Sequence, residues 1–203
     1  MDVLTVVLFS YLSGSIPFGL IVTKFFGHKD IRNIGSGNIG ATNVLRTGNK
    51  YLAALTLLLD ILKGFIPVIV TQQYFTELTQ LSCLLAFLGS IFPIWLKFKG
   101  GKGVAIYVGI LFALSIQLGI LFIFSWVVVS LIFKYSSLSS MFSSLTVFVV
   151  TLIKDTALQS IGSTTYTEEK LAFILFIFFI LIMFTHKKNI SNLKNKSEHK
   201  IKI

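Results

Sequence analysis

The sequence predicts an all-α integral membrane protein with about seven transmembrane helices. Only 13% of the 203 residues are charged, which is roughly half the share found in soluble domains. Apolar runs of nearly membrane-spanning length recur along the chain, as expected for a polytopic helical protein. The twenty phenylalanines lie in too few segments of alternating pattern for a membrane β-barrel.

The first three apolar segments occupy the first half of the chain. The first, Val3–Thr23, contains S-G-S-I-P at Ser13–Pro17, which predicts a kink or a close contact with another helix. A basic loop, Lys24–Lys50, separates it from the second segment, Tyr51–Thr71. The third segment is Leu78–Leu96.

The second half begins with one apolar run of about thirty residues, Val104–Phe133. That length is too great for one upright helix and small for two. We therefore expect a break near Ser115–Gly119, where the run is polar and contains glycine, and two short or tilted helices. The sixth segment is Leu138–Ile153, and the seventh is Leu171–Thr185, which should begin earlier, near Thr167.

The distribution of lysine and arginine predicts the orientation in the membrane. With seven spans, 15 of the 18 Lys and Arg residues lie on one side, including those of a polar basic tail at residues 187–203. Cytoplasmic loops carry the excess of these residues, so we predict an external N-terminus and a cytoplasmic C-terminus. Reading Val104–Phe133 as one helix would place Lys134 and the tail outside, against this bias. We expect residues 1–203 to form one polytopic domain with a flexible tail.

The net charge of +10 indicates an anionic partner, which could be nucleic acid, anionic lipid or an anionic substrate. The cations lie in loops beside membrane segments, and the sequence contains no nucleic-acid-binding module. Nucleic acid is therefore the least favoured of the three.

The loop Ser36–Arg46 has the sequence S-G-N-I-G-A-T-N-V-L-R. Glycines let backbone amides approach a ligand closely, and Arg46 is always charged; this combination holds phosphate groups. A simple turn between two helices would also explain the glycines. It would not require Ser36, Asn38, Asn43 and Arg46 at fixed spacing, and the loop exceeds the usual length of about 4–6 residues. We therefore favour a functional role.

A second glycine-rich loop, G-G-K-G at Gly100–Gly103, directly precedes a predicted helix. Lys102 between its glycines is similar to a phosphate nest that leads into a helix N-terminus. The loop is not a Walker A motif, because G-x-x-x-x-G-K-[ST] is absent. The alternative is a basic anchor in the lipid headgroups, a role that suits Lys97 and Lys99. Two such loops suggest two phosphate groups handled at one membrane face.

Polar residues also lie at the end of the last segment and inside the second. His186 and Asn189 are three residues apart and share a helical face. Lys187 and Lys188 suffice to cap the helix dipole, which leaves His186 and Asn189 to point into the bundle. An i,i+3 charge pair, Asp60 and Lys63, lies inside the second segment. Such charges are functional candidates by default, but a mutually paired structural role explains them at least as well.

Several catalytic patterns are absent from the sequence. It has no H-x-x-x-x-D acyltransferase motif, no G-x-S-x-G elbow and no cluster of Cys and His. We therefore expect no metal and no cofactor. The only acids on the predicted cytoplasmic side are Asp30 and Glu198, so a reaction there must need little acid or base from the protein.

Five motifs together resemble the bacterial acyl-phosphate-dependent glycerol-3-phosphate acyltransferases, the PlsY-type family. They cover nearly the whole chain in order, and the long first-loop motif is highly specific. The motifs are G-S-I-P at Gly14–Pro17, the loop Ser36–Arg46, L-D-I-L-K-G at Leu59–Gly64, F-K-G-G-K-G-V-A at Phe98–Ala105 and H-K-K-N-I at His186–Ile190.

The resemblance implies a seven-helix enzyme of the bacterial inner membrane with its active site at the cytoplasmic face. Such an enzyme moves a fatty acyl group from acyl phosphate to the 1-hydroxyl of glycerol 3-phosphate, giving lysophosphatidic acid without coenzyme A or acyl carrier protein. The implied partners are the two substrates and membrane lipid, with no nucleic acid. We expect a monomer.

The resemblance also implies which residues form the site. Family positions in the catalytic site match Ser36, Arg46, Lys102, His186 and Asn189, and substrate-binding loop positions match Gly37, Asn38, Gly40, Asn43, Gly101 and Gly103. One departure concerns the family's G-H-x-F-P motif. Here Gly89–Pro93 has the sequence G-S-I-F-P, with Ser90 in place of the histidine, so no role of that histidine carries over.

The expected chemistry fits this set of residues. An acyl phosphate is already activated, so catalysis can rest on positioning and charge stabilisation. The proton of the attacking hydroxyl can pass to His186 or to a substrate phosphate; we favour the substrate as base and His186 as a ligand. A transporter of anionic solutes should show an inverted repeat or matching intramembrane charges, and a lipid-binding scaffold would leave Ser36–Arg46 unexplained.

Overall fold

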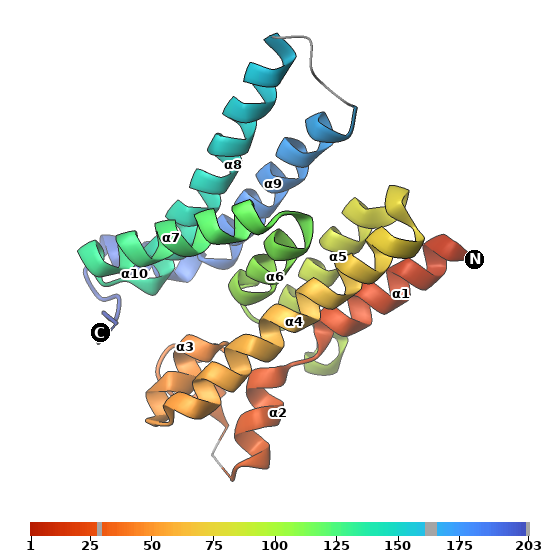
Figure 1. Ribbon diagram of the computed structural model, residues 1–203. Helices are drawn as coiled ribbons and strands as arrows, with labels where there is room; N and C mark the ends of the chain where they lie inside the picture. The colour runs from red at the N-terminus through yellow and green to blue at the C-terminus, as the bar shows by residue number, and fades with distance from the viewer. Residues whose placement is uncertain (28–29, 161–165, 202–203) are drawn as a thin grey trace. The chain divides into compact units, whose positions relative to one another are not determined.

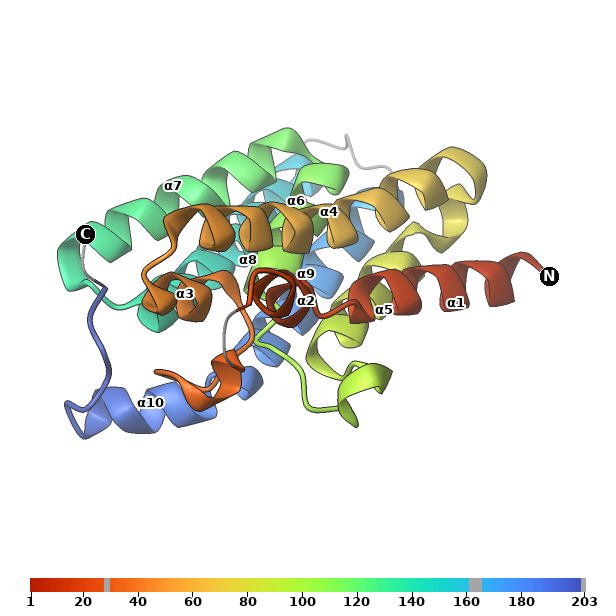
Figure 2. The same cartoon turned by 90° about the horizontal axis from the view of Figure 1, so that it is seen from below.

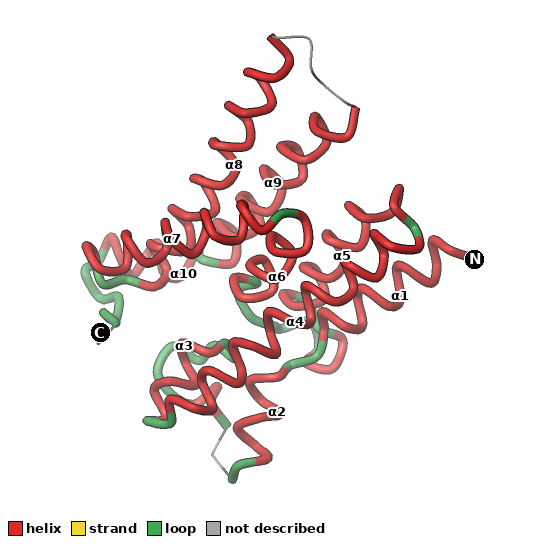
Figure 3. The backbone as a smooth tube through the Cα atoms, in the orientation of Figure 1, coloured by secondary structure: helices red, strands yellow, loops and turns green. Residues whose placement is uncertain are grey.

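The computed structural model describes residues 1–27, 30–160 and 166–201, and within these ranges the chain forms helices and loops without a strand (Figure 3). Residues 28 and 29 of the basic loop and residues 202 and 203 of the tail lie outside the described residues. The chain divides into two compact units, residues 1–116 and 117–203.

The first unit contains the helices of the N-terminal half (Figure 1). In order they are α1 (Asp2–Ser15), α2 (Phe18–Phe25), η1 (Ile31–Asn33), α3 (Ala41–Val44), η2 (Leu45–Thr47), α4 (Lys50–Tyr74), η3 (Thr76–Leu78), α5 (Thr79–Ile91), η4 (Ile94–Leu96) and α6 (Val104–Leu114). The second unit contains α7 (Ile116–Phe133), which begins at the boundary, α8 (Ser136–Ser160), α9 (Tyr166–Thr185) and α10 (Lys187–Lys194).

In the first unit, α1 lies along α5, and α4 lies along α6 (Figures 1 and 2). Small residues allow the close approach of α1 and α5: Gly14 lies directly against the backbone of Ala86, and the hydroxyls of Ser10 and Ser82 are hydrogen-bonded at 2.8 Å. In lipid, helix association depends on such close packing and on polar contacts. The unit is therefore held together by small and hydroxyl-bearing side chains as well as by apolar ones.

The kink expected at Ser13–Pro17 is confirmed, because α1 ends at Ser15 and α2 begins at Phe18 with a bend of 45°. Pro17 has no N–H, so a helix passing through it would leave a carbonyl without its partner. Lys63 of α4 contacts this break, since its Nζ donates at 2.9 Å to the carbonyl oxygen of Ile16, which also accepts from the backbone N–H of Phe18 at 3.1 Å. The same Nζ lies 2.7 Å from Asp60 Oδ1, and both side chains are buried. The intramembrane charge pair therefore binds the broken end of another helix.

The break expected near Ser115–Gly119 is also confirmed. Ser115 has an extended backbone, with φ −165° and ψ 130°, and it separates α6 from α7. The start of the last segment near Thr167 agrees with a helix that begins at Tyr166.

Four described helical stretches are long and apolar enough to cross a membrane, and there are up to six if each bent helix pair forms one span. They are Lys50–Tyr74, Thr76–Leu96, Ile116–Phe133 and Ser136–Ala157, and the bent pairs are α1 with α2 and the end of α9 with α10. Helix α6 is apolar but shorter. The integral membrane class is thus evident, while the count of seven spans and the orientation of the termini stay predictions.

In the second unit, α8 and α9 run side by side (Figure 1). The rings of Phe148 and Phe176 pack at a centroid distance of 5.2 Å, and Trp126 Nε1 on α7 donates to Ser140 Oγ on α8 at 3.1 Å. Between α9 and α10 the chain bends by 59°. After α10 the chain returns to the start of α8, where Ile201 N donates to the carbonyl oxygen of Lys134 at 2.7 Å.

Candidate active site

The first glycine-rich loop is fixed to the first unit by apolar side chains. Ile31, Ile39 and Val44 are buried in one cluster, together with Val22 of α2 and Leu52 of α4. Burying a side chain of this size stabilises a fold by about 1.5–3 kcal/mol. Three such anchors within 14 residues explain how a long loop with little regular structure keeps a defined shape.

Asn43 holds the loop together with its side-chain amide, which is only 2% exposed. Its Nδ2 donates to the carbonyl oxygens of Ile31 and Asn38, both at 2.7 Å. Its Oδ1 accepts hydrogen bonds from the backbone N–H of Ser36 at 3.1 Å and from the Ser36 hydroxyl at 3.3 Å. Because both donor protons and the oxygen are engaged in the loop, Asn43 acts as its scaffold.

Ser36 and Arg46 lie beside each other at the loop surface. Gly35 has a φ of +54°, and a methyl group placed on it would lie 2.6 Å from both Cδ and Nη1 of Arg46 and 2.7 Å from Asn43 Oδ1. The Arg46 side chain therefore lies across Gly35, next to the residue that binds Ser36. Both Ser36 and Arg46 are exposed, so a guanidinium and a hydroxyl of the same loop are accessible to a ligand.

A second arginine near this loop, Arg32, already has an anionic partner. Asp30 accepts hydrogen bonds from the guanidinium and from the backbone N–H of Arg32, which together hold the pKa of the Asp30 carboxyl below its ordinary value. The carboxylate thus stays ionised and neutralises Arg32. Arg46 is therefore the better candidate for binding a phosphate.

The second glycine-rich loop is folded back onto the end of α5. The amides of Gly100 and Gly101 donate to the carbonyl oxygens of Ile91 and Ser90, each at 3.1 Å. A methyl group on Gly100 would lie 2.3 Å from the Ser90 oxygen, so only glycine permits this approach. These two amides are directed at α5, so the expected nest cannot use them for phosphate.

The two loops meet in the first unit. A methyl group on Gly101 would lie 3.5 Å from both Asn38 Oδ1 and Ile39 Cγ1, which is ordinary van der Waals contact. Lys102 follows directly, half-buried, and Gly103 at φ +78° leads into α6. The backbone next to Lys102 therefore lies against the loop that carries Ser36, Asn38 and Arg46.

His186 and Asn189 lie at the bend between α9 and α10 in the second unit, and both are buried. Their burial agrees with the expectation that His186 and Asn189 point inward, whereas Lys187 and Lys188 are exposed. His186 Nδ1 lies 2.8 Å from the carbonyl oxygen of Ile182. A carbonyl only accepts hydrogen bonds, so Nδ1 carries the proton, and in the neutral ring Nε2 carries the lone pair.

Sequence reasoning missed Glu198, the partner of Asn189, and Ser137, which binds the same carboxylate. Asn189 Nδ2 donates to Glu198 Oε1 at 2.6 Å, and the buried Ser137 hydroxyl donates to the same oxygen at 2.9 Å. The signal in the sequence was the scarcity of acids on the predicted cytoplasmic side, where Glu198 is one of two. Among the described residues, no group of three His, Cys, Asp or Glu side chains could hold a metal ion.

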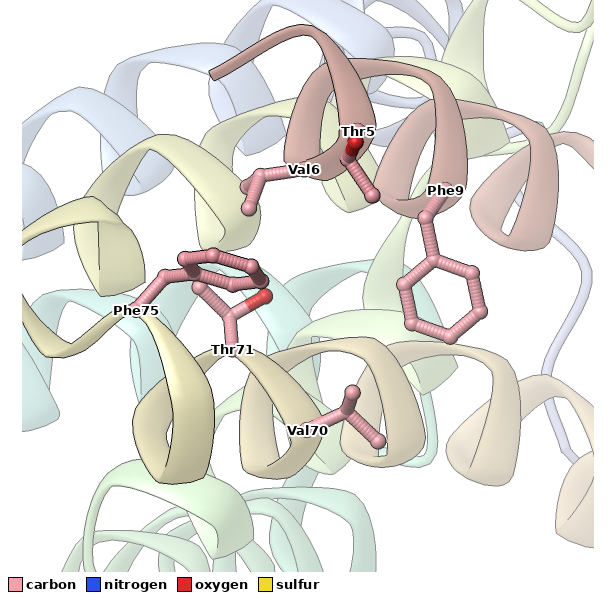
Figure 4. A pocket seen from close by; sticks show the side chains of 6 residues that line it. All are labelled: Thr5, Val6, Phe9, Val70, Thr71 and Phe75. Atoms are coloured by element: carbon pink, nitrogen blue, oxygen red, sulfur yellow. The ribbon is translucent and has the colours of Figure 1, made fainter. Parts of the chain in front are cut away.

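An apolar pocket of about 260 Å³ between α1 and the end of α4 is a different feature (Figure 4). Its lining residues are Thr5, Val6, Phe9, Val70, Thr71 and Phe75. The hydroxyls of Thr5 and Thr71 already donate to backbone carbonyls of their own helices, so the lining offers nothing to an anion. With a rise of 1.5 Å per residue, this end of α4 lies roughly 30 Å from the end that follows Arg46.

Comparison with known proteins identifies the family. The family model described as glycerol-3-phosphate acyltransferase matches residues 4–196. This chain belongs to the glycerol-3-phosphate acyltransferase family. A glycerol-3-phosphate acyltransferase of Pelagibacter ubique is 53% identical over 203 residues, covering 100% of both chains. One of Brucella anthropi is 45% identical over 193 residues, covering 95% of this chain and 90% of that protein.

Two solved structures are also similar to this glycerol-3-phosphate acyltransferase family member. One is the crystal structure of PlsY, an integral membrane glycerol 3-phosphate acyltransferase, in its glycerol 3-phosphate form. It has a TM-score of 0.86 and 34% identity, covering 100% of this chain and 96% of that chain. The lysophosphatidic acid form has a TM-score of 0.84 and 33% identity, covering 98% and 95%. Membership in this family sets aside the transporter and scaffold alternatives, and this chain is a multi-pass membrane protein.

Proposed function

We propose that this protein transfers a fatty acyl group from acyl phosphate to the 1-hydroxyl of glycerol 3-phosphate, giving lysophosphatidic acid and inorganic phosphate. The observation that carries the proposal is the meeting of the two glycine-rich loops, which places the backbone next to Lys102 against the loop that carries Ser36 and Arg46. Both substrates carry phosphate, and similar proteins are acyltransferases named for glycerol 3-phosphate. We further propose that Ser36, Arg46, Lys102, His186 and Asn189 all act in this one reaction.

In this reaction the 1-hydroxyl oxygen forms a bond to the acyl carbonyl carbon, and the bond from that carbon to the phosphate oxygen breaks. The leaving phosphate takes the electron pair, and the hydroxyl gives up its proton. Arg46 and Lys102 would stabilise the negative charge that develops on the carbonyl oxygen and on the leaving phosphate. Since the acyl phosphate is already activated, no metal or organic cofactor is needed.

The proton on His186 Nδ1 defines what this residue offers to the substrate. With Nδ1–H directed at Ile182, a neutral His186 accepts a hydrogen bond from a glycerol hydroxyl through Nε2. It donates to a phosphate through Nε2 only as imidazolium. We therefore propose that His186 binds the hydroxyl end of glycerol 3-phosphate, while a substrate phosphate accepts the proton.

The cellular setting is part of the same proposal. We place the protein in the bacterial inner membrane as a monomer and one polytopic domain, with an external N-terminus, a cytoplasmic C-terminus and both loops facing the cytoplasm. The support is the position of 15 of the 18 Lys and Arg residues in the loops and tail of one predicted side.

The test is an assay of the purified protein with acyl phosphate and glycerol 3-phosphate, in parallel with acyl-coenzyme A and acyl carrier protein donors. We expect lysophosphatidic acid and inorganic phosphate in a 1:1 ratio from acyl phosphate, and no product from the other donors. Product formed from acyl-coenzyme A alone would contradict the proposed donor while leaving the acyltransferase assignment intact.

A further inference from the structure

The segment that follows α10 is attached to the rest of the second unit at both ends. At its start, the backbone N–H of Ser197 donates to the carbonyl oxygen of Asn192 at 2.8 Å. At its end, Ile201 N donates to the carbonyl oxygen of Lys134 at 2.7 Å, and Lys200 Nζ lies 5.9 Å from the centre of the Tyr135 ring. Glu198 lies between these attachments, so its position is fixed by the fold.

The carboxylate of Glu198 collects hydrogen bonds from three side chains. Asn189 Nδ2 and Ser137 Oγ donate to Oε1 at 2.6 and 2.9 Å, and Asn192 Nδ2 lies 3.4 Å from Oε2. Both Asn189 and Ser137 are buried. An ionised carboxylate can only accept hydrogen bonds, so the Asn189 atom that faces it must be the amide nitrogen. The amide plane is therefore set, and Oδ1 is turned away from Glu198.

We propose that Glu198 is a positioning residue that makes Asn189 present its amide oxygen to a hydroxyl group of glycerol 3-phosphate. Hydroxyls donate hydrogen bonds, whereas a phosphate only accepts them, so an amide oxygen selects the glycerol end of the substrate. The amide oxygen of Asn189 then determines the specificity for a polyol phosphate over inorganic phosphate. The inference rests on the proposed function, in which Asn189 contacts glycerol 3-phosphate.

The competing interpretation is that the Glu198 carboxylate occupies the place of a substrate phosphate and inhibits the enzyme. The two interpretations predict opposite changes in the affinity for glycerol 3-phosphate when the carboxylate is removed. Removing a positioning carboxylate weakens the binding of glycerol 3-phosphate and leaves the binding of inorganic phosphate unchanged. Removing a competing carboxylate strengthens the binding of both ligands.

The experiment measures kcat, KM for glycerol 3-phosphate and the inhibition constant of inorganic phosphate for Glu198→Ala, Asn189→Ala and the double variant. We expect each single variant to raise KM roughly tenfold, the effect of losing about 1.4 kcal/mol, with a smaller change in kcat. The double variant should resemble Asn189→Ala within about twofold, because Glu198 acts through Asn189. The inhibition constant of phosphate should stay constant in all of them.

Two further variants serve as controls. Glu198→Gln retains one accepting oxygen, so its KM should lie between those of the wild type and Glu198→Ala. Glu77→Gln removes the same charge at an exposed residue of η3 in the first unit and should leave KM unchanged. The midpoint of thermal unfolding in detergent is measured for every variant. A variant with a raised KM and an unchanged midpoint has lost positioning and not its fold.

Three outcomes would overturn the inference. Additive losses in the double variant would mean that Glu198 does not act through Asn189. A lower KM or tighter phosphate inhibition in Glu198→Ala would identify an inhibitory carboxylate. An unchanged KM in a folded Glu198→Ala would leave Glu198 with no role in recognition. A wild-type protein that makes no lysophosphatidic acid would instead contradict the proposed function itself.

Discussion

At the scale of single residues, the loop cations and hydroxyls separate into scaffold and ligand candidates. Asn43 uses its whole amide inside the loop, and Arg32 is paired with Asp30, whereas Arg46 lies exposed across Gly35. The sequence predicts that these residues belong to one site, but it cannot predict which of them already have hydrogen-bond or ionic partners within the protein. That distinction depends on hydrogen bonds that form only when the loop is folded.

The first prediction concerns Arg46 and Lys102. Changing either to alanine should cost about 2–4 kcal/mol of transition-state stabilisation, the range for losing one key charge-stabilising donor. This should be measured as kcat/KM with acyl phosphate and glycerol 3-phosphate. Lys97→Ala, at an exposed position five residues before Lys102, should change kcat/KM little. Equal losses of kcat/KM in all three variants would mean that these cations act through general surface charge.

The second prediction uses the tautomer of His186. In His186→Asn the amide can still donate to the Ile182 carbonyl, but nothing replaces Nε2; in His186→Gln the longer amide can reach toward Nε2. We expect His186→Asn to raise KM for glycerol 3-phosphate more than it lowers kcat, and His186→Gln to recover part of the loss. A fall of about 10²–10⁴-fold in kcat, with KM unchanged, would identify His186 as the general base.

At the scale of elements, the sequence predicted helix breaks better than it predicted loop chemistry. Pro17 and Ser115 mark real breaks, because a missing N–H and a polar residue in an apolar run interrupt helices locally. The glycines of G-G-K-G suit a phosphate nest and a close backbone approach equally well. For Gly100 and Gly101 the structure shows the close backbone approach, with their amides donating to α5. The return of Glu198 to Asn189 has no local signal, since it depends on where α10 ends.

The third prediction tests how the first loop supports Arg46. Gly35→Ala adds a methyl group at 2.6 Å from Arg46 at a φ of +54°, so it should displace the guanidinium. Gly48→Ala is the matched control, because Gly48 has a φ of +88° with nothing within 4 Å of an added methyl group. Both variants carry the strain of a left-handed backbone, roughly 1 kcal/mol, visible as a lower thermal midpoint. Only Gly35→Ala should also lower kcat/KM; an equal loss in Gly48→Ala would show that strain alone is responsible.

At the scale of the whole molecule, the prediction concerns orientation. The single cysteine of the sequence, Cys83, is first replaced by alanine. In this background, cysteines introduced in place of Lys50 and Lys194, both exposed, should be shielded from an impermeant thiol reagent in intact cells and labelled after lysis. A cysteine at Tyr74, exposed at the opposite end of α4, should be labelled without lysis. Labelling of the Lys50 or Lys194 position in intact cells would overturn the predicted orientation.

The contact between Lys63 and the Ile16 carbonyl also bears on how the protein is made. The two residues are 47 positions apart in the chain, so the break in the first helix enters the membrane before the Lys63 side chain that contacts it has been synthesised. Until then the Ile16 carbonyl has the N–H of Phe18 as a donor but lacks the second hydrogen bond from Lys63, and an incompletely hydrogen-bonded backbone group is costly in lipid. We therefore expect the bend of the N-terminal segment to be fully stabilised only when α4 emerges beside it. Release of the first helix into the bilayer is thereby linked to the synthesis of α4, and a nascent chain truncated before Lys63 should remain next to the insertion machinery.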